Sequence, residues 1–446
     1  GRFAAARRQP PAGAPTSGGG GARSVYDAGS RAMSSSTPTS TAAAAPRFGV
    51  YIHFPYCRQH CPYCDFAVAV RKQIPHDRYL RAIRAELRRK APLFAGRAAV
   101  SVYLGGGTPS LWRPDCIAAV IAAVTAEFPP PPGCAPEITL ECDPVGVEPE
   151  ILLALRQAGV NRLSIGAQSL QPRHLVQLGR QHAPEDVRTV VARARAAGFA
   201  NLSLDLMIGL IDQKRPELDD DLQAALALRP EHISLYQLTI EPGTALAAAI
   251  RRGRLTAPSD DEQADAYDRV REVLAADYEH YEISSFARRA PDPAVDYRAR
   301  HNRLYWTLGE YLGLGVSAHS FRRLAAGGGE RFANVRGVES YLAAWATNDA
   351  TDRAPLSDPA AAPGLALHEH RDAAALAREG LWLGLRALTG LSRREFLSQH
   401  GHDPLSQHRA QIEALQARGL LAVEGDLVRL TRRGTLFADE VGAVFL

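Results

Sequence analysis

The chain has 446 residues, 46% hydrophobic and 22% charged, which is ordinary for a folded globular protein and excludes disorder throughout. Residues 1–46 carry five Arg against one Asp, so 47–446 hold 47 basic and 47 acidic side chains and are neutral overall. This neutrality argues against a nucleic-acid partner, and the longest apolar stretch, Cys116–Ala126, is about half as long as a membrane-spanning helix.

Residues 1–46 are rich in Ala, Gly, Ser, Pro and Arg and contain no Glu or Lys. This composition is typical of an organellar transit segment, with the mitochondrion favoured over the plastid. The alternative is a disordered tail without an address on a cytoplasmic protein. Either way, we expect residues 1–46 to be a disordered leader outside the fold.

Six short runs, rich in β-branched and other apolar residues, have the length and composition of buried strands. They are Gly49–His53, Val100–Leu104, Glu137–Glu141, Arg162–Ile165, Leu202–Leu206 and His232–Leu238. Helical patterns separate them; for example, Ser259 and Glu262 form a capping-box signature that predicts a helix start.

Alternating strands and helices predict an α/β fold with a parallel sheet and right-handed crossovers. The pattern alone leaves open whether this sheet is flat or curled into a partial barrel. Polar and glycine-rich residues follow several of the strands, and in parallel barrels such strand ends are where ligands bind.

Three of the six cysteines, Cys57, Cys61 and Cys64, follow the first strand with C-x3-C-x2-C spacing. Three thiolates can hold a [4Fe–4S] cluster while leaving one of its four irons open for chemistry. The alternative is a structural zinc site completed by His53 or His60, but the chain has no second cysteine pair of the usual zinc spacing. The remaining cysteines are predicted to be small buried hydrophobic residues.

The cysteine motif, the aromatic Tyr63 and the run Gly105-Gly106-Gly107 after the second strand together resemble the radical S-adenosylmethionine superfamily. Within it, residues 47–446 resemble the group related to coproporphyrinogen dehydrogenase, which contains HemN and the haem chaperone HemW family. The resemblance implies a partial (β/α)6 barrel. It also implies a cluster whose open iron binds S-adenosylmethionine, which reduction then cleaves to a radical.

The resemblance further implies which residues contact S-adenosylmethionine. They lie near the cysteines or at successive strand ends: Tyr51, Tyr63, Gly106, Gly107, Thr108, Glu141, Gln168, Arg180 and Asp205. The chain departs from the family after the fifth strand, where relatives have Gly-Leu-Pro-Gly-Gln and this sequence has Gly209-Leu-Ile-Asp-Gln213. The geometry of that turn is therefore not predicted.

Two features favour HemW over HemN. HemN-like proteins have a further cysteine two residues after the third ligand, where this chain has Phe66, and they begin with a structured segment in place of a low-complexity leader. In addition, His301 to Trp306 match the HNxxYW motif of the HemW family. Because imidazole is a common axial ligand of haem iron, His301 is predicted to contact haem, with His319 as the next candidate. Without the family match, a buried hydrogen-bonded histidine would be the preferred interpretation.

The resemblance and the sequence pattern together give a domain organisation of a radical S-adenosylmethionine core over 47–290, an extension with the HNxxYW motif over 291–354, a low-complexity linker over 355–366 and a small domain over 367–446. The small domain is predicted to be α+β and winged-helix-like, with a helix at Gln411–Arg418 and strands near Leu420–Val423 and Leu427–Leu430. It has ten Arg and ten acidic residues, so a lid or docking role is preferred over DNA binding.

The sequence thus predicts a cluster-containing protein that binds haem and delivers it to a haem-acceptor protein, with a reductant protein for the cluster. The first alternative is an oxygen-independent coproporphyrinogen III dehydrogenase in porphyrin biosynthesis. The second is a non-catalytic interaction module that binds a cluster or zinc. No catalytic residue is assigned from the sequence.

Overall fold

The computed structural model describes residues 45–346 and 354–446. The predicted leader therefore falls outside the described residues except for its last two. Within the described ranges, no helix combines the length and apolar character required to cross a membrane.

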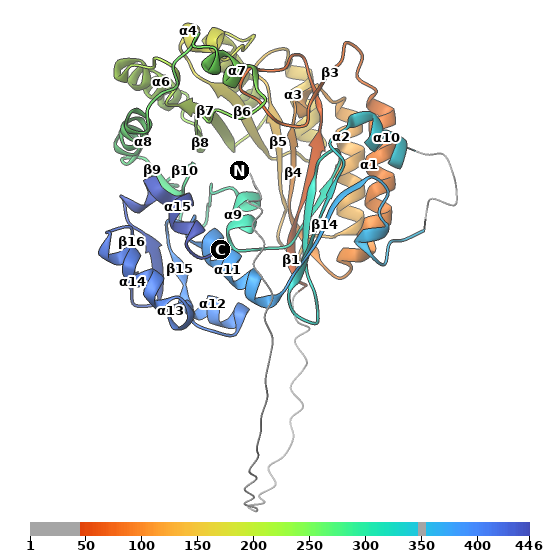
Figure 1. Cartoon of the computed structure of the whole chain (residues 1–446). Helices are drawn as coiled ribbons and strands as arrows, with labels where there is room; N and C mark the ends of the chain where they lie inside the picture. The colour runs from red at the N-terminus through yellow and green to blue at the C-terminus, as the bar shows by residue number, and fades with distance from the viewer. Residues whose placement is uncertain (1–44, 347–353) are drawn as a thin grey trace, which may run out of the picture. The chain divides into compact units, whose positions relative to one another are not determined.

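Six parallel strands form the centre of a twelve-stranded sheet (Figure 1). They are β1 (Arg47–Phe54), β4 (Ala98–Gly106), β5 (Glu137–Cys142), β6 (Arg162–Gln168), β7 (Leu202–Ile208) and β8 (His232–Gln237). Their order in the sheet follows their order in the chain, as successive βα units require. Each contains one of the six predicted strands or overlaps it, so the sequence-based assignment is confirmed.

Helices connect these strands and cover one face of the curved sheet (Figure 1). The connecting helices are α1 (His76–Lys90), α2 (Pro114–Glu127), α3 (Pro149–Gln157), α4 (Pro172–Gln177), α5 (Pro184–Ala196) and α6 (Arg215–Ala227). Two further helices, α7 (Ala245–Arg251) and α8 (Asp260–Leu274), follow β8. Helix α8 begins with the predicted capping box, since Ser259 Oγ accepts a hydrogen bond from the backbone N–H of Glu262 at 3.2 Å.

The sheet continues beyond the six parallel strands on both sides and does not close. After β8 come the antiparallel strands β10 (Ser285–Arg288) and β9 (Tyr278–Glu282). On the other side, β1 pairs in parallel with β11 (Tyr311–Leu314). The outer strands are then β12 (His319–Arg323), β13 (Gly329–Asn334) and β14 (Leu365–Arg371). The fold is therefore a partial barrel with two free edges, which settles the choice that the sequence pattern left open.

The structure corrects two predicted boundaries, the linker over 355–366 and the start of the small domain at residue 367. Strand β14 (Leu365–Arg371) lies across both. Its residues are the edge strand of the main sheet, and Leu356 and Ala362 are buried in the main core. A short 3-10 helix, η4 (Pro359–Ala361), lies between them. Because Ala and Pro dominate residues 355–366, the sequence pattern did not reveal that two of their side chains are buried in the main core.

The other described elements outside the small domain lie around the twelve-stranded sheet. They are β2 (Tyr56–Cys57), β3 (Ala69–Val70), η1 (Ala91–Phe94), η2 (Pro109–Leu111), α9 (Arg300–Trp306) and α10 (Val338–Trp345).

The small domain begins at Asp372, whose side chain caps the first helix of this region. It contains α11 (Ala373–Gly384), β15 (Leu391–Ser392), α12 (Arg393–His400), α13 (Pro404–Gln407), α14 (Arg409–Ala417), β16 (Leu421–Glu424), β17 (Leu427–Leu430), η5 (Gly434–Phe437) and α15 (Ala438–Ala443). It has its own three-stranded sheet and hydrophobic core. The predicted helix and hairpin are confirmed.

A buried polar network joins α1 to the outer part of the sheet. The Glu86 carboxylate accepts hydrogen bonds from Lys90 Nζ at 2.5 Å, Asn334 Nδ2 at 2.6 Å and Tyr341 Oη at 2.6 Å. The backbone N–H of Gly315 donates the fourth, at 2.9 Å. Since the Glu86 and Lys90 side chains are fully buried, the charge of Glu86 is compensated by these donors, and that of Lys90 chiefly by the Glu86 carboxylate.

We expect Glu86→Ala to destabilise the fold by about 3–5 kcal/mol, because it removes the negative charge beside the buried Lys90 ammonium and the acceptor of three further donors. Urea unfolding followed by circular dichroism measures this change. The matched control is Glu127→Ala on the exposed face of α2, which should change stability by about 0.5 kcal/mol or less. Equal effects of the two substitutions would contradict the structural role of the network.

Candidate functional site

The three motif cysteines lie in the segment that follows β1: Cys57 ends the short strand β2, which pairs with β3, and Cys61 and Cys64 lie on the loop between them. All three are half-buried. The backbone N–H of Cys64 donates to the Cys61 carbonyl at 3.1 Å, which folds the loop back on itself. Of the remaining cysteines, Cys116 and Cys142 are buried as predicted, whereas Cys134 is half-buried.

Polar donors from two other segments reach the thiol groups. Thr108 Oγ1 donates to Cys57 Sγ at 3.5 Å, and Arg180 Nη1 lies 3.8 Å from Cys61 Sγ. Burial raises the pKa of Cys57 to about 11, so at neutral pH its thiolate requires a nearby positive charge such as a metal ion. The surroundings of the cysteines therefore fit a cationic cluster held by thiolates.

Arg180 links the cysteine loop to the strand ends. Its Nη2 forms an ion pair with Asp143 at 2.6 Å and donates to the Gly166 carbonyl at 3.3 Å. Its Nε is enclosed and has no hydrogen-bond partner among the described residues. A buried donor without an acceptor is costly, and the carboxylate of a bound ligand could satisfy it. Asp143, the ion-pair partner of Arg180, was not predicted as a site residue, although it directly follows Glu141 and Cys142 in the sequence.

Glu141, at the end of β5, is held by two donors. Its Oε2 accepts from the backbone N–H of Gly106 at 3.0 Å, and its Oε1 accepts from Tyr103 Oη at 3.0 Å. Burial and the negative charge of Asp205 raise the pKa of Glu141 to about 7. The site thus contains an acidic side chain that is only half ionised near neutral pH, and a cationic ligand would favour its charged form.

The glycine run brings the backbone close to its neighbours. A Cβ at Gly106, where φ is +111°, would lie 2.5 Å from the His53 ring, and a Cβ at Gly107 would lie 2.8 Å from the Tyr56 carbonyl oxygen. Any larger residue would therefore displace the cysteine loop or β1. This packing explains the glycines without a ligand, while it also keeps the Gly106 N–H directed at Glu141.

Asp205 and Gln168 complete the ends of the neighbouring strands. Ser164 Oγ donates to the Asp205 carboxylate at 2.9 and 3.0 Å, and burial raises the pKa of Asp205. Gln168 ends β6 with a φ of +61°, a conformation that is uncommon for a residue with a side chain and that can mark a functional site. Its Nε2 lies near the backbone of Gly166, the residue whose carbonyl binds Arg180.

The tyrosines near the cysteines have different surroundings. Tyr63 packs against the apolar cluster that includes Leu178 and Met207, and its hydroxyl interacts with Cys61. Tyr51 lies on β1, and its hydroxyl is 3.1 Å from His53 Nδ1. His53 Nε2 faces the Ala67 carbonyl at 2.9 Å and so carries the proton, which makes Nδ1 the acceptor of the Tyr51 hydrogen bond.

His53 and His60 do not support the zinc alternative in this structure. Both ring nitrogens of His53 are hydrogen-bonded, and its pKa is lowered to about 4 by burial. His60 Nε2 lies 3.1 Å from the Cys64 carbonyl.

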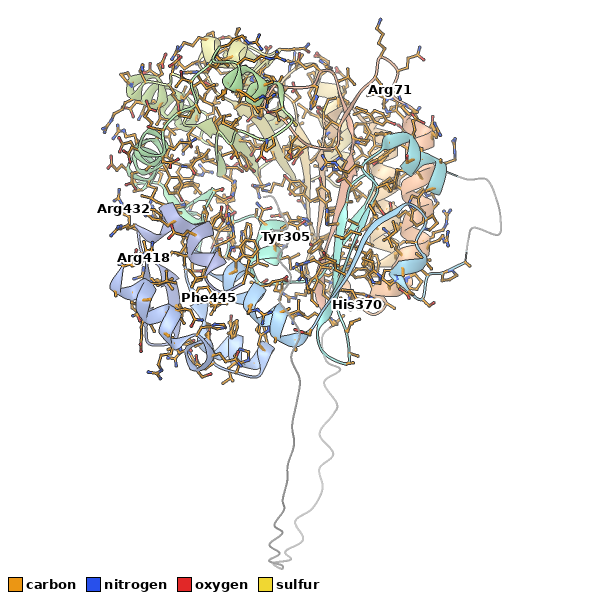
Figure 2. All side chains as sticks on the ribbon, in the orientation of Figure 1. Arg71, Tyr305, His370, Arg418, Arg432 and Phe445 are labelled. Carbon is orange, nitrogen blue, oxygen red and sulfur yellow. The ribbon has the colours of Figure 1, made fainter. Side chains whose placement is uncertain are left out.

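His301, the first residue of the HNxxYW motif, lies on α9 and is 2% exposed. Its Nδ1 is 2.9 Å from Ser101 Oγ, and its Nε2 is 2.9 Å from Tyr305 Oη. Figure 2 labels Tyr305 on this helix. The ring also packs on Tyr103, which donates to Glu141. His301 is therefore connected to Glu141 through Tyr103. Both imidazole nitrogens of His301 already have hydrogen-bond partners.

Comparisons with known proteins agree with this geometry. Residues 51–225 match the radical SAM superfamily, and residues 372–437 match the HemN C-terminal domain. The chain is 32% identical to the heme chaperone HemW of Escherichia coli over 90% of this chain and 98% of that protein. It is 33% identical to the mitochondrial radical S-adenosyl methionine domain-containing protein 1 of Bos taurus, over 91% of this chain and 88% of that protein.

Among solved structures, the fold matches that of coproporphyrinogen III oxidase, HemN, from Escherichia coli. The TM-score is 0.72 at 24% sequence identity, with 90% of each chain covered. This likeness extends the agreement in fold to the outer strands and to the small domain.

The partial barrel, with three thiols, an arginine and two half-buried carboxylates near its strand ends, together with the match over residues 51–225, is that of a radical S-adenosylmethionine protein. Within that superfamily, the chain belongs to the haem chaperone HemW family.

Proposed function

We propose that this protein is a haem chaperone, which binds haem and passes it to an acceptor protein. The observation that carries the proposal is the similarity to proteins named heme chaperone HemW over about nine tenths of this chain. Phe66 adds support from the structure. It replaces the further cysteine of HemN-like proteins and is 55% exposed beside the cysteine loop, where it offers flat apolar area to a porphyrin.

The proposal includes a [4Fe–4S] cluster on Cys57, Cys61 and Cys64, with S-adenosylmethionine bound beside it. The enclosed Nε of Arg180 is suited to a carboxylate, and Glu141 and Asp205 are suited to the amino and ribose hydroxyl donors of the cofactor. When both groups are bound and a reductant protein supplies an electron, they provide radical chemistry. The backbone and side chains of this chain hold and orient them; Tyr51, Tyr63, Gly106, Gly107, Thr108 and Gln168 complete the proposed contacts.

For haem, we propose His301 as the axial ligand. In the structure its Nε2 is bonded to Tyr305 Oη, so coordination requires that hydrogen bond to open. We expect His301→Ala to weaken haem binding and shift the haem absorption bands, and Tyr305→Phe to bind haem at least as tightly as the parent, since it frees the ligand nitrogen.

Both variants should keep the iron and sulfide content of the parent protein, because the hydrogen bonds of His301 do not reach the cysteine loop. Unchanged haem spectra in His301→Ala would rule out this ligand, and His319→Ala, which alters an exposed histidine on β12, then tests the next candidate.

We also propose that residues 1–46 direct import into the mitochondrion, in line with the relative from Bos taurus that is named as mitochondrial. Fused to a fluorescent reporter, this segment should produce a mitochondrial signal in cells, since basic, acid-poor leaders are imported by that route. The control replaces its five arginines by glutamine. A diffuse signal from the unaltered segment would contradict the targeting proposal.

A further inference from the structure

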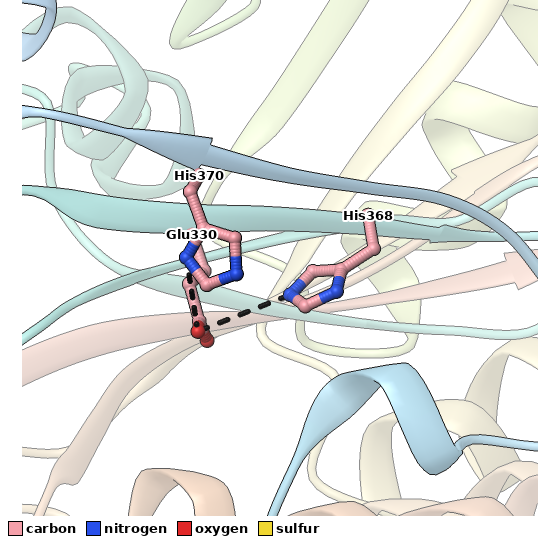
Figure 3. Close-up of side chains that lie close together, drawn as sticks. All are labelled: Glu330, His368 and His370. Carbon is pink, nitrogen blue, oxygen red and sulfur yellow. Dashed lines mark ion pairs between the residues drawn. The ribbon is translucent and has the colours of Figure 1, made fainter.

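Two histidines and a glutamate lie together on the outer strands of the main sheet, away from the cysteine site. His368 and His370 are on the edge strand β14, and Glu330 is on its neighbour β13 (Figure 3). In the antiparallel register Glu330 faces His370 directly, and Phe332 faces His368. Because side chains two residues apart on a strand share a face, the pairing places all three on the same side of the sheet.

Their potential ligand atoms are close. Glu330 Oε1 lies 3.5 Å from His370 Nδ1 and 3.9 Å from His368 Nε2, and all three atoms lie within 4.8 Å of one another. Ligand atoms that share a tetrahedral zinc ion lie about 3.4 Å apart, given bonds of about 2.1 Å. Small side-chain rotations would therefore bring these atoms to coordination distance.

Among the described residues, one imidazole nitrogen of this cluster is enclosed and lacks a hydrogen-bond partner. The Nε2 of His368 is enclosed and has no hydrogen-bond partner among the described residues, since 3.9 Å from Glu330 is too long for a hydrogen bond. Arg322 Nε binds the other oxygen of Glu330, Oε2, at 2.8 Å. That bond orients the carboxylate and leaves Oε1 facing the histidines. His370, 66% exposed, gives access from solvent.

We propose that Glu330, His368 and His370 form a second metal site, which binds a divalent transition-metal ion such as Zn²⁺ or Fe²⁺. Two imidazoles and one carboxylate are a common ligand set for both ions, and solvent fills the remaining positions. Binding connects the edge strand β14 to β13, immediately before the small domain starts at Asp372. The site is separate from the cysteines, because its residues lie on the outer strands β13 and β14, whereas the cysteines follow β1 beside the short pair β2 and β3; Figure 2 labels His370 on β14.

The test uses full-length protein whose cysteines already hold a reconstituted cluster and from which loosely bound metal has been removed with a chelator. Anaerobic titration with Zn²⁺, and separately with Fe²⁺, against a chromophoric chelator measures stoichiometry and affinity. We expect one ion per chain beyond the cluster for at least one of the two metals. His370→Ala should weaken that binding by about tenfold or more, because one of three protein ligands is lost.

His319→Ala, which removes a different exposed histidine from the same sheet, should leave the affinity unchanged. As a second measurement, hydrogen exchange of the β14 amides should slow when the ion is added to the parent and to His319→Ala, but not to His370→Ala. Equal affinity in the parent and in both His370→Ala and His368→Gln would overturn the proposal, as would the absence of any bound ion beyond the cluster.

Discussion

Replacing any one of Cys57, Cys61 and Cys64 by Ala should abolish the broad thiolate-to-iron absorption of the reconstituted protein. A cube held by only two thiolates loses a ligand that its surroundings do not replace, since Thr108, Tyr63 and Arg180, which contact the thiols, offer hydroxyl and guanidinium groups. Iron and sulfide content should fall together to a small fraction of the parent value.

The matched controls are Cys116→Ala and Cys142→Ala, which remove buried thiols on α2 and β5. Both should retain the cluster, although each loses some packing. Loss of the cluster in Cys142→Ala while its circular dichroism stays native would make that thiol a fourth ligand and would contradict the open iron.

Glu141→Gln should weaken S-adenosylmethionine binding to the cluster-loaded protein by about 1.5–3 kcal/mol, or roughly ten- to 150-fold. The substitution preserves shape but removes the negative charge that attracts the sulfonium and the amino group. Equilibrium dialysis under anaerobic conditions measures the change. The control is Glu150→Gln on the exposed start of α3, which should bind like the parent.

The same residue should make binding depend on pH. Because the pKa of Glu141 is raised to about 7, the carboxyl is mostly protonated at pH 6 and mostly ionised at pH 8. Affinity of the parent should therefore fall as the pH is lowered, by about tenfold over this range. Glu141→Gln should show a much flatter profile. A profile as steep as that of the parent would assign the titration to another group.

Strand positions could be predicted because each parallel strand is a short, continuous apolar run between helices. The same reasoning failed for β14, whose sequence has three apolar residues followed by four polar or charged ones at a sheet edge, and which follows an Ala- and Pro-rich stretch. The small domain was placed five residues too early for that reason.

The turn after β7 contains the departure from the family sequence, and its backbone has a conformation that glycine favours. Asp212 stands where relatives have glycine, and its φ of +55° is the left-handed conformation that glycine favours. Asp is one of the few other residues that adopt it readily. The sequence alone revealed the substitution but not the backbone conformation that Asp212 adopts.

From the sequence, the proposed S-adenosylmethionine contacts could be assigned only through the resemblance to a family. The residues that meet in the site lie far apart along the chain. Tyr103 was not predicted, although it precedes the glycine run by two residues on the same face of β4. Its hydroxyl binds Glu141, and its ring packs on His301. Only the folded strand order reveals that connection between the HNxxYW motif and the cofactor site.

The most direct test of the account compares two activities of one anaerobic, cluster-reconstituted preparation. Haem binding and transfer to an apo haem protein are followed by absorption, and decarboxylation of coproporphyrinogen III is followed by product analysis. The account predicts stoichiometric haem binding with transfer to the acceptor and no decarboxylation. Decarboxylation with repeated turnover in the absence of haem transfer would contradict it.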